Sequence, residues 1–288
     1  MPTERLDPDA LLCRRCGYPL DAVLHEFACP ECGTPIASSM PEMRVGSPWQ
    51  RGGSFASWLR TLAALARWRQ LFDTITIGKH DAEWLLRINL GLAALLTACA
   101  FAEDRIDEVL LHSRGSLAGL LGALLILTPA AYAVLRGLTA IERAGLQFFG
   151  NKRGGRVTPG IARAVTAHAS YGWMLAGLLA VILAFLGHSV FRTWYGSLGT
   201  WWVLRLVPAH TAFAAGGFFA GLIVFETLSY LGTLRCRFAN LPRPHAESTN
   251  ESGANAEPSV DNNEQQPPSD SSSDDVSPQA DAAHPSRQ

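Results

Sequence analysis

Four cysteines near the N-terminus form the pattern in this sequence with the clearest chemistry. Cys13, Cys16, Cys29 and Cys32 are spaced C-x2-C-x12-C-x2-C, and a glycine directly follows each pair. Two pairs of thiolates held in tight turns can close a tetrahedral shell around one metal ion. A module of fewer than about 40 residues has too little core to fold alone, so metal binding must supply most of its folding energy. We therefore predict a metal-binding module in residues 1–36.

The segments around these cysteines, CRRCGYPL and ACPECGTP, resemble the knuckles of zinc ribbons and rubredoxin-like modules. Rubredoxin-like modules of the rubrerythrin kind accompany a di-iron helical bundle with paired E-x-x-H motifs, and this sequence has no such pair. The resemblance therefore implies zinc as the cofactor, with iron as the alternative. Two disulfides are a further alternative, but the topology argued below places the cysteines in a reducing compartment, where disulfides are rare.

Most of the remaining chain is too apolar for a soluble protein. The formal charge of −1 is the sum of a basic body and an acidic tail, because residues 1–240 hold 22 Lys/Arg against 16 Asp/Glu. The body contains four stretches of about 20 residues that are nearly free of charge, as a membrane-spanning helix requires. We predict transmembrane helices near 84–102, 116–135, 171–190 and 209–233. A fifth crossing is an alternative, because residues 164–172 are also apolar.

The segments outside the apolar stretches have distinct compositions. Residues 37–53 are rich in Pro, Gly and Ser and predict a linker. Residues 54–72 carry apolar side chains at helical spacing with Arg60, Arg67 and Arg69 mostly off that stripe, which indicates an amphipathic helix. It either lies in the headgroup layer or packs on the membrane bundle. Residues 241–288, rich in acid, Ser, Asn, Gln and Pro, predict a disordered tail that either solubilises the protein or binds a partner.

The distribution of basic residues predicts the orientation in the membrane. The segments 67–87 and 136–170 hold four and six Lys/Arg, and three arginines follow the last stretch, whereas the loops 103–115 and 191–206 hold two each. Basic segments beside transmembrane helices stay in the cytoplasm. We expect an all-α helix bundle in the cytoplasmic (inner) membrane, with four spans, possibly five, a small N-terminal zinc ribbon and both termini in the cytoplasm.

Glu226 is the only charged residue in the fourth apolar stretch. A carboxylate within a membrane helix costs several kcal/mol unless it is paired or hydrated, so it is a candidate functional residue. The alternative is a structural glutamate near the helix end that pairs with Arg136 or Arg235.

Three histidines are a weaker candidate site. His112, His188 and His210 all fall near the predicted outer ends of different segments. They would bind a metal outside the cytoplasm if the fold brought them together.

Other sequence features bear on activity and partners. The sequence contains no nucleophile elbow, phosphate-binding loop or H-E-x-x-H motif, so no catalytic residue is predicted and an enzyme is not expected. The basic segment 151–156 lacks interleaved aromatic residues, which argues against nucleic-acid binding. Small residues spaced four apart allow close helix contacts, within one chain or in a homo-oligomer; the pairs are Ala118/Gly122, Ala176/Ala180 and Gly217/Gly221.

The whole layout resembles bacterial membrane proteins that carry an N-terminal CxxCGYxL…CPECG zinc ribbon. The segment ERAGLQFFGNKRGGRVTPGIARAVTAHASYGW, which begins at residue 142, is also similar to members whose membrane part is of the Yip type, a family that usually has five spans. The resemblance implies no particular activity. We expect a non-enzymatic scaffold or adaptor that displays its ribbon to a protein partner; the alternative is a small transporter or channel that uses Glu226.

Overall fold

The computed structural model describes residues 10–78, 81–102, 106, 109, 116–195 and 209–241, with the backbone alone at 81, 188, 190–195, 209 and 210. These residues belong to one compact unit. Within them every regular element is a helix, and the only β pairing is two isolated bridges at the cysteine knuckles. The predicted all-α class is therefore confirmed.

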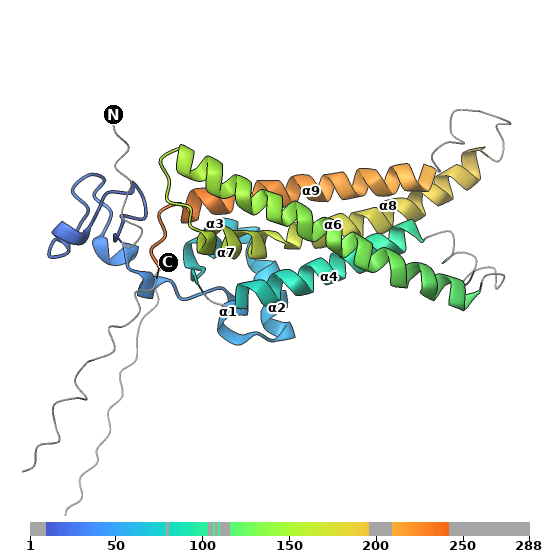
Figure 1. Ribbon diagram of the computed structural model, residues 1–288, viewed down its shortest axis with the longest axis horizontal. Helices are drawn as coiled ribbons and strands as arrows, with labels where there is room; N and C mark the ends of the chain where they lie inside the picture. Colours follow the sequence, from blue (N-terminus) through green and yellow to red (C-terminus); the bar gives the residue numbers. More distant parts are fainter. Residues whose placement is uncertain are drawn as a thin grey trace, which may run out of the picture. The chain divides into compact units, whose positions relative to one another are not determined.

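Four long helices run side by side in Figure 1 and form the bundle. Each is long and apolar enough to cross a membrane, so the number of candidate spans agrees with the prediction. They are α4 (Asp81–Phe101), α6 (Leu117–Lys152), α8 (Tyr171–Tyr195) and α9 (Ala209–Cys236). The end of the bundle that carries the Lys/Arg-rich segments is called the basic end below.

Two of these helices differ from the simple prediction. Helix α6 continues 17 residues beyond the predicted end at 135, because residues 136–152 contain no proline and their Arg, Leu, Ala, Glu and Gln residues favour a helix despite three glycines. Helix α8 is preceded by a shorter buried helix, α7 (Pro159–Ala169), which Thr158 caps by accepting a hydrogen bond from the backbone N–H of Ile161. The apolar segment 164–172, considered for a fifth crossing, thus belongs to α7 and the start of α8, and no fifth candidate span occurs among the described residues.

Small residues allow α8 and α9 to pack closely along their length. A Cβ placed on Gly217 would lie 2.6 Å from the carbonyl oxygen of Leu179, and Gly221 lies directly against Ala176. The small-residue faces of these two helices therefore meet within the chain. Ala118 and Gly122 at the far end of α6 face no such neighbour.

The segment predicted as a linker contains regular structure and buried side chains. It holds two short 3-10 helices, η2 (Ile36–Ser39) and η3 (Pro41–Met43), and helix α1 (Pro48–Gly52), in which Trp49 and Gln50 are buried. One of its glycines, Gly53, ends α1 by adopting a left-handed conformation (φ +57°). Proline and glycine here mark turns in a segment that packs on the helices, since Ser47 Oγ lies 2.9 Å from His168 Nε2 of α7.

The predicted amphipathic helix is divided into α2 (Phe55–Ala64), η4 (Leu65–Arg67) and α3 (Trp68–Thr74). The inner face of α2 packs on the bundle, because Trp58 Nε1 donates to Asn89 Oδ1 of α4 at 2.7 Å and the Tyr171 hydroxyl donates to the Trp58 carbonyl. The outer face exposes three large apolar side chains, Phe55, Leu59 and Leu62. Packing on the bundle is therefore observed, and the outer face still suits a membrane interface.

Candidate metal centre

The two cysteine pairs adopt the same local structure. In the first knuckle, Cys13 N–H donates to the Tyr18 carbonyl and Gly17 N–H donates to the Cys13 carbonyl. The second knuckle repeats both bonds, sixteen residues later, from Cys29 to Thr34 and from Gly33 to Cys29. Gly17 and Gly33 have φ values of +80° and +68°, a conformation that other residues rarely adopt. The repeated C-x2-C-G sequence therefore encodes two equivalent turns.

The four sulfur atoms come together where the two knuckles face each other. Cys13 Sγ lies 3.6 Å from Cys32 Sγ, Cys16 Sγ lies 3.7 Å from Cys29 Sγ, and all four lie within 4.8 Å of one another. A tetrahedral zinc site with Zn–S bonds of about 2.3 Å has sulfur atoms about 3.8 Å apart. The observed spacing fits such a site, and none of these cysteines is disulfide-bonded. The four predicted ligands thus form a possible metal-binding site, and its donor set suits zinc or iron equally.

The surroundings of Cys16 and Cys32 shift the pKa values of these two thiols in opposite directions. Burial raises the pKa of Cys16 to about 12. Hydrogen bonds from the Thr34 hydroxyl and backbone lower the pKa of Cys32 to about 6, with the Thr34 Oγ1 atom 3.2 Å from the sulfur. Cys32 therefore becomes a thiolate at a lower pH than Cys16, and Thr34 is the residue that stabilises its charge.

The metal ribbon, residues 10–36, is attached to the basic end of the bundle by a buried asparagine. Asn240, just beyond α9, accepts a hydrogen bond from Leu12 N–H at 2.9 Å and donates to the Leu12 carbonyl at 2.8 Å. Its amide also donates to the Ser39 carbonyl, and its oxygen accepts from Arg156 at 2.9 Å. One side chain therefore satisfies buried polar groups of the ribbon, the following segment and the α6–α7 connection.

Two further contacts support this attachment. The Arg156 guanidinium donates to the Ala10 carbonyl, at the start of the ribbon. Gly17 lies against the ring of Phe238, so that a Cβ there would be 2.6 Å from the nearest ring atom. The first knuckle thus faces the bundle, and the corresponding glycine of the second knuckle, Gly33, has no atom within 4 Å of such a Cβ. Sequence analysis did not identify Asn240, Phe238 or Arg156, since none belongs to a recognisable motif.

Glu226 does not pair with either arginine considered for it. Arg136 binds Glu83 at 2.6 Å, and Arg235 lies 3.8 Å from Asp73. The carboxyl group of Glu226 instead faces that of Glu142 on α6, a residue that sequence analysis did not select. The signal available in the sequence was the position of Glu142 seven residues beyond the second apolar stretch, whereas Glu226 lies inside the fourth.

The remaining sequence candidates have simpler positions. His112 and the side chains of His188 and His210 lie outside the described residues, so the structure does not test the proposed histidine cluster. Cys236 is buried in an apolar cluster with Phe72 and Val165, and Cys99 is half-buried on α4, so both lie outside the cysteine cluster.

Comparisons of the chain with protein-family models, curated proteins and solved structures found no match. The assignment of a function therefore depends on the geometry alone.

Proposed function

We propose that this chain is an inner-membrane scaffold or adaptor that presents a zinc-loaded ribbon to a protein partner in the cytoplasm, without catalytic activity. The support is a cluster of four cysteines that could hold a metal ion, joined to four apolar helices, together with the basic segments that flank them. In this role, zinc is structural: Cys13, Cys16, Cys29 and Cys32 would hold it and leave no open position for a substrate.

The observation that carries the proposal is the exposure of apolar side chains on the loop between the knuckles. Phe27 is 97% exposed and Leu24 is 43% exposed. The backbone at Phe27 is nevertheless fixed, because its carbonyl accepts a hydrogen bond from Ile36 N–H. A fully exposed aromatic side chain on a fixed backbone is typical of a residue that anchors an interface.

The attachment of the ribbon to the bundle gives this surface a defined direction. The first knuckle is covered by Phe238 and Asn240, whereas Phe27 and Leu24 are free of the bundle. A partner that binds them would meet a preorganised site, which reduces the entropy lost on binding.

Site-specific photo-crosslinking in cells tests this proposal. A photoreactive phenylalanine analogue at position 27 should crosslink to a discrete second protein, and the Cys16→Ser substitution should abolish the product because the ribbon no longer folds. The same analogue at exposed position 31, on the second knuckle, is the matched control and should give little product. Absence of a crosslinked protein at position 27, or a product that persists in the Cys16→Ser variant, would contradict the proposal.

A small transporter or channel is the second candidate, because the Glu226 and Glu142 carboxyl groups face one another between α6 and α9. Solute flux into proteoliposomes that survives removal of residues 1–36 but disappears in Glu226→Gln would favour it. Partner capture that depends on Phe27, with no Glu226-dependent flux, would favour the scaffold.

A further inference from the structure

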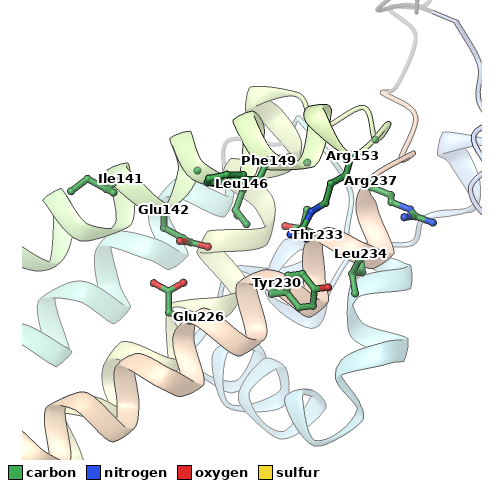
Figure 2. Close-up of a pocket in the computed structure, with 13 residues that line it drawn as sticks. Ile141, Glu142, Leu146, Phe149, Arg153, Glu226, Tyr230, Thr233, Leu234 and Arg237 are labelled. Atoms are coloured by element: carbon green, nitrogen blue, oxygen red, sulfur yellow. The ribbon is translucent and has the colours of Figure 1, made fainter. Parts of the chain in front are cut away.

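Helices α6 and α9 are neighbours that leave a groove between them. Helix α9 packs along α8 and α6 packs against α4, whereas α6 and α9 make few contacts with each other. Two cavities occupy the groove. The first, of about 460 Å³, lies towards the basic end and includes Glu142, Glu226, Arg153 and Arg237 (Figure 2). The second, of about 290 Å³, is almost wholly apolar and is closed on its third side by α4.

The two glutamates give the first cavity a local negative charge. Figure 2 shows their carboxyl groups pointing towards each other from α6 and α9. Glu226 is exposed and Glu142 is half-buried. Two carboxylates that face each other repel unless they share a proton or a cation lies between them. A shared proton or a positively charged ligand can therefore stabilise this arrangement, and an anionic ligand cannot.

An ion-pair cluster places these glutamates near the edge of the hydrocarbon layer. Glu83 at the start of α4 binds both Arg136 and Arg143 of α6, at 2.6 and 3.2 Å. Charged groups of this kind mark the polar boundary of a membrane bundle. Glu142 directly precedes Arg143 and lies seven residues, or about 10 Å, beyond the apolar stretch predicted to end at 135, whereas Glu226 lies seven residues before the end predicted at 233. The pair therefore lies close to the boundary between the hydrocarbon layer and the lipid headgroups.

The apolar cavity lies along the same two helices, farther from the basic end than the glutamates. Val134 and Phe218, which line it, each precede the corresponding glutamate by eight residues, or about 12 Å along a helix. The cavity is therefore at the depth of acyl chains of the same leaflet. The groove thus combines an acidic site at headgroup depth with an apolar site at chain depth.

We propose that the α6–α9 groove is a binding site for one aminophospholipid of the phosphatidylethanolamine class. Its ammonium group, with three N–H donors, lies between Glu142 and Glu226, and one acyl chain enters the apolar cavity. The phosphate and glycerol occupy the 12 Å between them. Phosphatidylcholine has the charge but no N–H donor for the carboxylates, and phosphatidylglycerol has no cation, so both bind more weakly.

The arginines of the first cavity provide the matched control. Arg153 and Arg237 each lie eleven residues beyond a glutamate, about 16 Å farther from the membrane, so the ammonium site does not involve them. The pair Glu142→Gln/Glu226→Gln keeps side-chain size and removes the charge. The pair Arg153→Gln/Arg237→Gln removes charge from the opposite end of the same cavity.

Native mass spectrometry of the full chain, with defined lipids added to the detergent-solubilised protein, tests the proposal. Phosphatidylethanolamine should bind at one copy per chain and at least tenfold more tightly than the other two lipids. The glutamine pair at 142 and 226 should lose this preference, and the arginine variant should keep it. Ala130→Phe, which fills the apolar cavity from an exposed position on α6, should weaken binding of all three lipids.

Three results would overturn this assignment. They are equal binding of the three lipids, phosphatidylethanolamine binding that is unchanged in the glutamine pair, and a preference for phosphatidylglycerol that disappears in the arginine variant. The last result would identify an anionic lipid at the opposite end of the cavity. The outcome does not depend on what the ribbon binds, because none of these variants alters a ribbon residue.

Discussion

The side-chain amide of Asn240 pairs with both main-chain groups of Leu12, a residue 228 positions earlier in the chain. The amide supplies one hydrogen-bond donor and one acceptor to the Leu12 backbone, as a neighbouring β-strand would. The end of the last membrane helix is thereby joined to the residue that precedes the first metal ligand.

Asn240→Ala should detach the ribbon without removing its metal. The substitution leaves the buried polar groups of Leu12 and Ser39 without a partner, which lowers the free energy of unfolding by about 2–4 kcal/mol. Thermal unfolding should show this loss, and limited proteolysis should cut at residues 37–46 faster. Asn240→Asp keeps the acceptor and loses the donors, so it should fall between wild type and alanine. Unchanged proteolysis in the alanine variant would show that other contacts hold the ribbon.

Equivalent glycines in the two knuckles should tolerate substitution differently. Gly33→Ala costs only the strain of a positive φ, roughly 1–2 kcal/mol, because nothing surrounds the added Cβ. Gly17→Ala has the same strain and also collides with Phe238. We expect both variants to retain one metal ion per chain and Gly17→Ala to unfold at the lower temperature. Equal unfolding temperatures would mean that the Phe238 contact adds nothing.

The purified protein should contain one zinc ion per chain, measured by elemental mass spectrometry. Cys16→Ser should abolish stoichiometric binding, because three thiolates cannot complete the tetrahedral shell. Cys99→Ser is the matched control and should bind normally, since Cys99 lies on α4 outside the cluster. Stoichiometric iron with visible thiolate-to-iron absorption would instead identify a rubredoxin-like centre.

Zinc retention should depend on pH through Thr34. Protons compete with zinc for the thiolates, so zinc is held at high pH and released as the pH falls. Hydrogen bonds from Thr34 lower the pKa of Cys32 to about 6, which keeps this ligand ionised to lower pH. Thr34→Val removes the hydroxyl bond, raises the pKa of Cys32, and should move the midpoint of zinc release to higher pH by roughly half a unit.

The matched control for Thr34 is Tyr18→Phe, at the equivalent position of the first knuckle. It removes a hydroxyl group at a position where the pKa of Cys16 depends on the Tyr18 backbone. The midpoint of zinc release should therefore stay at the wild-type pH. A shift of the same size in both variants would indicate a general loss of ribbon stability.

Thiol labelling of single-cysteine variants should reveal the orientation of the bundle. Val45 and Gly154 are exposed at the basic end, so cysteines there should react with an impermeant reagent only after the inner membrane is lysed. A cysteine at position 198, in a predicted outer loop, should react once the outer membrane is permeabilised. Labelling at 45 without lysis would place the ribbon in an oxidising compartment and favour disulfides.

The sequence alone was sufficient to predict the cysteine cluster and the four helices that are long and apolar enough to span a membrane, because both depend on short-range information. A C-x2-C-G turn closes within five residues, and a spanning helix is defined by about 20 contiguous apolar residues. Helix ends were less predictable: the charge of Arg136 marks the end of the apolar stretch, whereas α6 continues as a helix to Lys152. Hydropathy indicates whether a segment suits the membrane or water. Helix propensity depends on the residue types, so a helix can continue past the end of an apolar stretch.

Only the tertiary structure determined which distant polar groups meet. Asn240 with Leu12, Trp58 with Asn89 and Glu142 with Glu226 join segments with no shared periodicity or motif. Glu226 was selected from its position, but its partner depends on which helix faces it, and that is set by the close packing of small residues between α8 and α9. Residues 37–53 looked like a linker because proline and glycine mark any turn; whether the turns face solvent or a buried surface depends on side chains elsewhere in the chain.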